Sequence, residues 1–100
     1  MYAAMRRKVN VLVEEALYYE LLKRSGSMGM SCSMYLNTAL YFRFRSGVLV
    51  YGVKVKRPYK RRCLYLSEGV HGFMKSRCQR LGCTYSEFIN GFLMEPKKER

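Results

Sequence analysis

Six basic side chains fall within nine residues just past the middle of the chain. They are Lys54, Lys56, Arg57, Lys60, Arg61 and Arg62. Ammonium and guanidinium groups at this density favour binding to a polyanion, of which nucleic-acid phosphate is the common example. A basic run can equally be a solvated linker. Here the run leads directly into a strand-like segment, and this favours a binding face.

The overall charge also favours a polyanionic partner. Nineteen Lys and Arg stand against seven Asp and Glu, a formal net charge of +12 on 100 residues. Such a charge is costly in self-repulsion unless a partner relieves it. No apolar run approaches the roughly 20 residues that span a bilayer, and the first residues do not have the pattern of a signal peptide. We therefore expect an intracellular protein that makes no membrane contact.

Residues that catalyse reactions or bind metals are sparse. The chain has one histidine, no paired catalytic carboxylates and no Gly-rich phosphate loop, so we expect it not to be an enzyme. The cysteines lack the paired Cys-x-x-Cys spacing of zinc sites. They are Cys32, Cys63, Cys78 and Cys83. We interpret them as small buried or half-buried hydrophobic side chains, and we expect neither a metal nor a cofactor.

Two stretches of the chain align without gaps at an offset of 53 residues. Residues 29–40 align with residues 82–93, with Gly, Ser, Asn and Leu identical at four positions. The same offset aligns Leu17 with Val70 and Leu21 with Met74. Chance does not easily give four identities together with matched apolar phases. We therefore interpret the chain as two copies of one structural plan.

The first copy predicts a strand followed by two helices. Its strand alternates an apolar with a mostly polar set, Val9, Val11 and Val13 against Lys8, Asn10 and Leu12. Glu14 and Glu15 suit the first turn of a helix, and Gly26 and Gly29 are natural stops. The apolar side of this helix is predicted to contain Leu17, Leu21, Leu22 and Met28. Ser31 or Ser33 then caps a second helix, with the apolar stripe Tyr35, Leu36, Ala39 and Leu40.

The second copy repeats this plan. Leu64 and Leu66 alternate with an outward set, Arg61, Cys63 and Tyr65. Ser67 is a good N-cap for a helix with the apolar positions Val70, Met74, Cys78 and Leu81, and Gly82 is its expected C-cap. Thr84 and Glu87 form a capping-box pattern before the last helix. That helix has the apolar stripe Phe88, Ile89, Phe92 and Leu93, and Pro96 ends it.

A short strand, a helix of about four turns, a Gly-x-Ser/Thr-x-Ser turn and a second helix together resemble the ribbon-helix-helix superfamily of Arc and MetJ type repressors. The turn is Gly29 to Ser33 in one copy and Gly82 to Ser86 in the other. Most members carry one copy and dimerise, whereas this chain carries two. The tandem form looks like transcription regulators of filamentous viruses of hyperthermophilic archaea. Arginine is common between the two turn hydroxyls of the family, but Cys32 and Tyr85 stand there in this chain.

The resemblance implies an α+β fold in which two motifs form an intramolecular pseudo-dimer, with a two-stranded antiparallel ribbon and four main helices. We expect a first motif over 1–45, a basic β-prone connector over 46–59, a second motif over 60–95 and a flexible tail over 96–100. A lone copy of about 40 residues cannot bury enough apolar surface to fold by itself. The four segments are therefore expected to make one compact domain.

The resemblance also implies the function: a transcription regulator that inserts the ribbon into the major groove of double-stranded DNA at an operator or promoter. The expected base-reading residues are Lys8, Asn10, Leu12, Arg61, Cys63 and Tyr65. The second helix of each copy is expected to aim its N-terminus at a phosphate. The expected phosphate contacts are Ser31, Ser33, Thr84, Ser86, Lys54, Lys56, Arg57 and Lys60. For the hydroxyls, plain N-capping needs the same residues.

The connector allows more than one interpretation. Residues 48–55 are β-prone and predict an extra strand or hairpin, whose exposed edge would join two molecules on adjacent DNA turns. Arg43 and Arg45 are candidates for a phosphate clamp with the basic run. An RNA-binding module is the alternative function, since charge and aromatic content would suit it, although stacked aromatics on a broad sheet are usual there. An antitoxin-like or virion structural DNA-binding protein is a third alternative.

Overall fold

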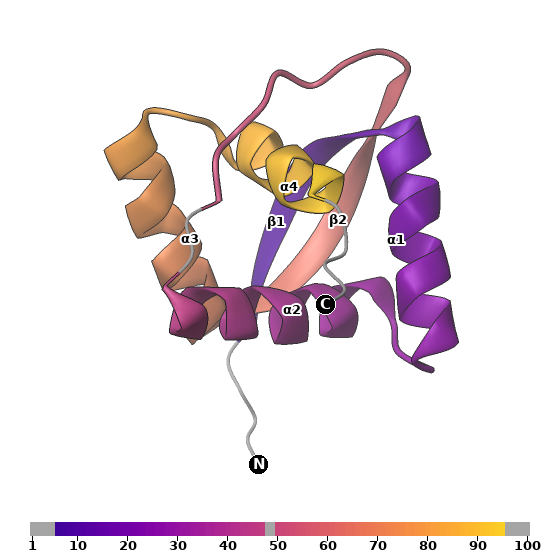
Figure 1. Ribbon diagram of the computed structural model, residues 1–100, viewed down its shortest axis with the longest axis horizontal. Coiled ribbons are helices and arrows are strands. Elements are labelled where there is room, and N and C mark those ends of the chain that lie inside the picture. The colour runs from indigo at the N-terminus through magenta and orange to yellow at the C-terminus, as the bar shows by residue number, and fades with distance from the viewer. Residues whose placement is uncertain (1–5, 48–49, 96–100) are drawn as a thin grey trace.

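The computed structural model describes residues 6–47 and 50–95. Within these residues the chain forms one two-stranded antiparallel sheet and four helices (Figure 1). In chain order the elements are β1 (Arg6–Glu14), α1 (Glu15–Ser27), α2 (Cys32–Ser46), β2 (Tyr59–Ser67), α3 (Glu68–Leu81) and α4 (Tyr85–Met94). This confirms the expected α+β class. The predicted tail over 96–100 lies outside the described residues.

The two strands pair in a register that follows from their alternation of side chains. Lys8 lies opposite Tyr65, and Asn10 lies opposite Cys63. The inward face of the sheet is formed by Val9, Val11, Val13, Leu64 and Leu66, each at most 5% exposed. Helix α2 contacts β2 and helix α4 contacts β1, and both cross in front of the strands in Figure 1. The predicted inward set is therefore confirmed, because an amphipathic ribbon must bury its apolar face against helices.

The helix ends follow the predicted capping residues. Ser67 accepts a hydrogen bond from Val70 N–H, and Thr84 and Glu87 form the capping box. Gly82 takes the left-handed conformation, with φ of 70°, just after α3. For α2 the N-cap is Ser31 rather than Ser33, since the Ser31 side chain accepts from Met34 N–H. These local signals are short-range, so the sequence encodes them directly.

Three predicted core positions are wrong. Leu22, Met28 and Leu81 are 41%, 58% and 36% exposed. In α1 the fully buried apolar side chain is Leu21, and its neighbour Leu22 is turned about 100° around the helix axis toward solvent. Met28 and Leu81 lie at helix ends, where less of the protein covers them. In α2 the buried stripe instead runs one turn further than predicted, to Phe44.

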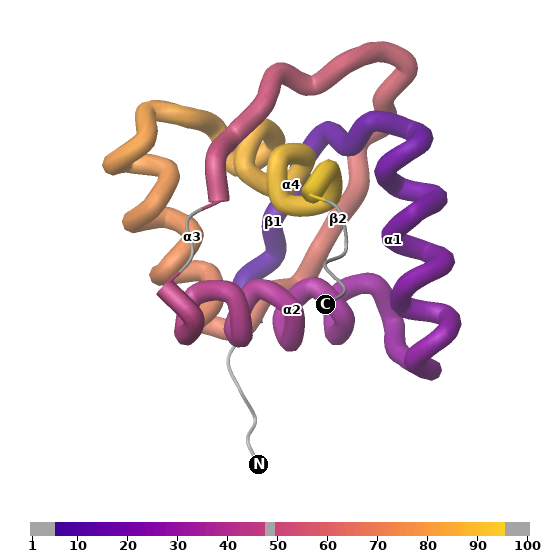
Figure 2. Tube along the Cα trace, in the orientation of Figure 1, coloured from indigo at the N-terminus to yellow at the C-terminus, as the bar shows by residue number. Residues whose placement is uncertain are grey.

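The connector forms no strand in its described part, residues 50–58. It runs past α4 to the start of β2 (Figure 2). Val53 N–H donates to the carbonyl of Glu87 at 3.1 Å, and a side chain at Gly91 would collide with the Tyr51 carbonyl oxygen. Val50 is fully buried. The prediction of a strand or hairpin is therefore wrong for these residues, because their backbone lies against α4 rather than pairing with a strand. Residues 48–49 lie outside the description.

Candidate nucleic-acid interface

The side of the ribbon opposite the core presents one continuous set of side chains, here called the outward face. It consists of Arg6, Lys8, Asn10 and Leu12 from β1, and Tyr59, Arg61, Cys63 and Tyr65 from β2. Leu12 and Tyr59 are half-buried and the others are exposed. Glu14 and Ser67 end the two strands with the same parity and are half-buried beside this face. All six residues predicted to contact bases lie on this face. Sequence reasoning missed Arg6 and Tyr59, although the same two-residue period, extended by one step in each strand, identifies them.

Two asparagines hold the outer edges of the ribbon. Asn90 Nδ2 donates to the Leu12 carbonyl at 2.8 Å, and its Oδ1 accepts from Glu14 N–H at 2.9 Å. Asn37 makes the same pair of contacts with β2, donating to the Tyr65 carbonyl at 2.8 Å and accepting from Ser67 N–H at 2.7 Å. Both asparagines, and the strand residues they bind, correspond at the offset of 53. Backbone groups that an edge strand leaves unpaired are thereby satisfied.

Ser33 and Ser86 add a second contact to each edge. Ser33 Oγ accepts from Tyr65 N–H at 3.0 Å, and Ser86 Oγ accepts from Leu12 N–H at 2.9 Å. Both were expected to contact phosphate, and neither is an N-cap. A hydroxyl that accepts from the strand keeps its own hydrogen to donate. The contacts also fix each hydroxyl beside a residue of the outward face.

The N-termini of α2 and α4 differ in charge. In α4, Glu87 Oε1 accepts from Thr84 N–H at 2.9 Å while Thr84 Oγ1 accepts from Glu87 N–H at 3.0 Å. A carboxylate therefore already occupies the positive end of this helix dipole. The first turn of α2 contains no acid, and Met34 stands at the position equivalent to Glu87. The dipole of α2 is thus free of this internal neutralisation.

The connector brings a cation to the α4 side of the ribbon. Lys54 lines a shallow pocket together with Leu12, Val55, Tyr59, Thr84, Ser86 and Glu87. Lys54, Lys56 and Arg57 are exposed, and the Arg57 guanidinium lies 5.4 Å from the centre of the Tyr59 ring. Lys60 is also exposed, but it lies opposite Val13 and so has the parity of the inward face. The structure therefore brings Lys54 to the outward face and turns Lys60 away from it.

The arginines of the predicted phosphate clamp in α2 are engaged elsewhere. Arg43 forms an ion pair with Glu95 and lies 5.6 Å from the centre of the Phe92 ring. Arg45 donates to the Tyr41 hydroxyl at 3.1 Å. Both residues lie in the last turns of α2. Their part in a phosphate clamp with the basic run stays a prediction.

Adjacent arginines of β2 have opposite environments. Arg61 is exposed on the outward face. Arg62 has the parity of the inward face, its guanidinium lies 3.9 Å from the centre of the Tyr18 ring, and its Nε is buried without a hydrogen-bond partner among the described residues. A guanidinium over an aromatic face is stabilised by the ring quadrupole. Arg61 is therefore available to a ligand, whereas Arg62 belongs to the packing.

Two acids of the helices pair with cations other than Lys8 and Arg61. Glu20 pairs with Lys23 and Arg24, and Glu68 pairs with Arg7. Within residues 6–47 and 50–95, none of the ion pairs involves Lys8 or Arg61. Lys8 and Arg61 are therefore cations of the outward face without an ion-pair partner among the described residues, and such cations attract an anion from solution.

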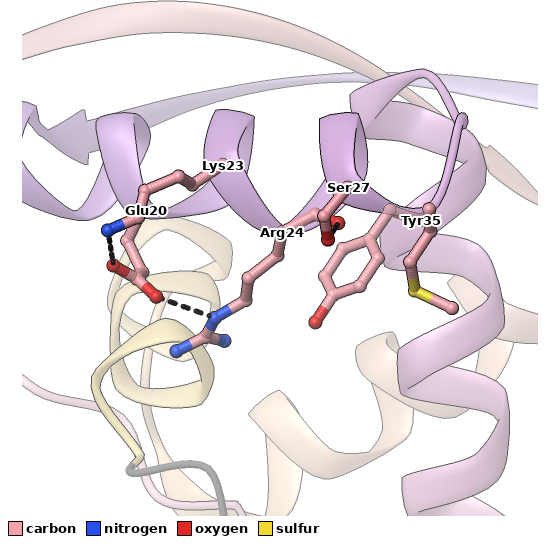
Figure 3. Close-up of a pocket in the computed structure, with 6 residues that line it drawn as sticks. Glu20, Lys23, Arg24, Ser27 and Tyr35 are labelled. Carbon is pink, nitrogen blue, oxygen red and sulfur yellow. Dashed lines mark hydrogen bonds and ion pairs between the residues drawn. The ribbon is translucent and has the colours of Figure 1, made fainter.

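A second pocket, between α1 and α2, has the opposite character. It is lined by Glu20, Lys23, Arg24, Ser27, Met28 and Tyr35 (Figure 3). Glu20 lies 3.1 Å from Arg24 Nε and 4.0 Å from Lys23 Nζ. One carboxylate thus holds both cations of the pocket. This surface is less suited to a polyanion than the outward face is.

The cysteines occupy three kinds of environment. Cys78 is buried, Cys32 and Cys83 are half-buried, and Cys63 is exposed at the centre of the outward face. Burial, with a smaller contribution from Cys83, raises the pKa of the Cys78 thiol to about 12. The interpretation of all four as buried or half-buried side chains is therefore wrong for Cys63. Its strand position faces solvent because the helices cover the other side of the sheet.

Comparison with protein families, with curated proteins and with solved structures finds no match to this chain. In the part of the chain that the structure describes, no helix is both long and apolar enough to cross a membrane. Among the described surfaces, the outward face combines exposed cations with a regular ribbon geometry.

Proposed function

We propose that this protein binds double-stranded DNA sequence-specifically as a transcription regulator, with the β1–β2 ribbon in the major groove. The observation that carries the proposal is the outward face, where a two-stranded antiparallel ribbon presents cations and exposed polar side chains over a buried core. The major groove is about 12 Å wide and admits a two-stranded ribbon. Charge attracts the duplex, and the face then supplies contacts to base edges.

The proposal includes a finer account of the fold, as a tandem ribbon-helix-helix pseudo-dimer within one chain. Asn10 and Cys63 are cross-strand partners and also correspond at the offset of 53. An approximate two-fold axis relating the two copies would therefore pass through this pair. The equivalent contacts of Asn37 and Asn90 support the same axis. Each copy uses its second helix to hold the strand of the other copy, so neither is complete alone.

The side chains of the outward face have the donor and acceptor types that base reading needs. Asn10 is suited to adenine, and Lys8 and Arg61 are suited to guanine. Leu12 and Cys63 present small or apolar surfaces to a thymine methyl group. Tyr65 is 44% exposed and offers a ring and a hydroxyl. Arg6, at the end of the same face, adds a cation for a flanking phosphate or base.

Phosphate contacts would come from both sides of the ribbon. Ser31 and Ser33 stand at the N-terminus of α2, and Thr84 and Ser86 stand at the N-terminus of α4. On the α4 side the Lys54 ammonium offsets the Glu87 carboxylate, since both line the same pocket. Lys56 and Arg57 extend this positive flank. Such contacts position the protein on the duplex without reading its sequence.

Titration of duplex DNA at several salt concentrations tests the proposal. Some 5–8 phosphate contacts predict a log–log slope of affinity against salt of roughly −4.5 to −7. Lys23→Ala is the matched control for Arg61→Ala, because both remove one exposed cation but Lys23 pairs with Glu20 on α1. We expect Arg61→Ala to weaken binding to the preferred site much more than Lys23→Ala does. A slope near zero, or equal effects of the two variants, would contradict the proposal.

An RNA-binding function is the second candidate, since Tyr59 and Tyr65 lie on the outward face with cations. A two-stranded ribbon offers less stacking area than the broad sheets of RNA-binding modules. Affinities for duplex DNA and single-stranded RNA at equal salt distinguish the two. Tighter binding of single-stranded RNA would replace the DNA proposal.

The pseudo-dimer is tested by dilution. If the two copies pair within one chain, folding is unimolecular. The melting temperature then stays constant as the protein is diluted. An obligate dimer of chains would instead melt at a lower temperature on dilution, as mass action requires. The measurement is a series of thermal melts over a wide range of chain concentrations.

A further inference from the structure

We infer that one molecule of this protein reads a non-palindromic duplex element, on which it sits in a single orientation. The inference rests on the proposed function and adds the class of site that the ribbon recognises. A ribbon built from two identical chains reads a palindrome, because the two-fold axis of the protein coincides with that of the site. Here both strands of the ribbon come from one chain, so nothing requires them to present the same residues.

Corresponding positions of the two strands present different chemistry. The axis through Asn10 and Cys63 relates Lys8 to Arg61 and Leu12 to Tyr65. It also relates Arg6 to Tyr59. An amide thus corresponds to a thiol, an aliphatic side chain to a phenol, and a guanidinium to a phenol. Only Lys8 and Arg61 share a charge. At every corresponding position of the outward face the residue type differs.

The contacts that hold the ribbon edges beside these positions are the same in both copies. Asn37 and Asn90, like Ser33 and Ser86, hold equivalent backbone groups at distances between 2.7 and 3.0 Å. The backbone would therefore present both strands to the duplex in equivalent poses. The asymmetry then lies in the outward side chains, where it changes recognition and leaves the docking geometry unchanged.

The flanks of the ribbon differ as well. The pocket beside Leu12 contains connector residues Lys54 and Val55 as well as Glu87. At the corresponding position beside Tyr65 on the α2 side, Met34 replaces Glu87. One flank thus carries a connector cation, Lys54, in the same pocket as a carboxylate. The other flank carries a helix N-terminus without an acid in its first turn. Turning the molecule around on the same duplex would exchange the positions of the β1 and β2 side chains over the bases, and would also exchange the two flanks.

The energetic consequence of such a turn is large. Each well-formed base contact discriminates against the wrong base by roughly 5- to 150-fold in affinity. Reversal places Arg61 over the base that suited Lys8, Cys63 over the base that suited Asn10, and Tyr65 over the base that suited Leu12. We therefore expect the affinity in the preferred orientation to exceed that in the reversed one by at least about 5-fold for a single lost contact.

Selection from random duplexes, with the full-length protein at one molecule per duplex, tests the inference. The wild type should select an element whose two halves differ. The informative variant is the triple substitution Arg61→Lys, Cys63→Asn and Tyr65→Leu, which makes these β2 positions the same as Lys8, Asn10 and Leu12. All three β2 side chains are exposed, so the variant should fold. Its selected core should become palindromic.

The control is the reciprocal variant, Lys8→Arg, Asn10→Cys and Leu12→Tyr, which should select a different palindromic core. A wild-type site that is palindromic at a stoichiometry of one to one would overturn the inference while leaving DNA binding intact. So would a triple variant that retains the asymmetric wild-type site. Absence of duplex selection by the wild type would instead overturn the proposed function, so the two failures are distinguishable.

Discussion

The two halves of this molecule share the contacts that hold the edges of the ribbon and differ on its exposed face. Asn37 and Asn90 hold opposite edges of one ribbon through the same pair of backbone groups. On the outward face, by contrast, Asn10 corresponds to Cys63 and Leu12 corresponds to Tyr65. The positions that build the ribbon keep their chemistry because a buried backbone group needs a partner. The exposed positions are free of that constraint, so their chemistry can differ between the two strands.

Substitution of the two asparagines should give the largest difference between the two halves. Asn90 is 1% exposed, whereas Asn37 is half-buried. Removing either side chain leaves a strand N–H and a strand carbonyl without a partner. Each such group that water cannot reach lowers the free energy of unfolding by about 1–3 kcal/mol. We expect Asn90→Ala to lower the free energy of unfolding by about 3 kcal/mol, and Asn37→Ala by about half as much. Urea unfolding measures both, and equal losses would contradict the role given to burial.

Arg61 and Arg62 sharpen the contrast between the exposed face and the packing. Arg61→Ala should weaken binding to the preferred duplex by about 1–3 kcal/mol and leave unfolding unchanged. Arg62→Ala should lower the free energy of unfolding by about 1 kcal/mol, because the contact with the Tyr18 ring is lost. Titration of a fixed duplex and urea unfolding of each variant are the measurements. If the two variants behaved alike in both assays, the assignment of opposite faces would fail.

Much of the scaffold could be predicted from the sequence because its signals are local. Alternation fixed the two faces of β1 and β2, and Ser67, Gly82 and Thr84 marked helix ends that the structure has. The six predicted readers all lie on the outward face for the same reason. Whether they contact DNA remains a prediction.

What could not be predicted depends on contacts between distant segments. The side chains of residues 50–55 suit a half-buried surface, and the sequence alone does not say whether that surface is a strand or a helix. The structure supplies α4, through the bond from Val53 to Glu87. Asn37 and Asn90 are identical at the offset of 53, so the sequence pairs them with each other. It does not reveal their strand partners, which lie 28 to 78 residues away. Leu22 was misplaced because periodicity gives a stripe but not its width.

His71 gives the smallest expected effect. Burial, then the charges of Arg7 and Lys75, lower its pKa below the ordinary 6.5, against an opposing contribution from Glu68. Below pH 6.5 the unfolded chain therefore takes up a proton that the folded chain resists, and stability falls as the pH drops, levelling off below the folded-state pKa. Thermal melts at about pH 5 and about pH 7.5 should show this loss in the wild type and less of it in His71→Gln. An unchanged difference in the variant would assign the loss to other groups.

Alkylation of Cys63 tests most directly whether the outward face is the DNA-binding surface. This thiol is exposed at the centre of that face, opposite Asn10, whereas Cys78 is buried. The protein would be treated with a maleimide with and without duplex DNA, and the modified cysteines located by mass spectrometry of peptides. We predict that saturating duplex protects Cys63, and that protection disappears at a salt concentration that abolishes binding. Full modification of Cys63 while the duplex stays bound would contradict the account, because the ribbon would then lie outside the interface.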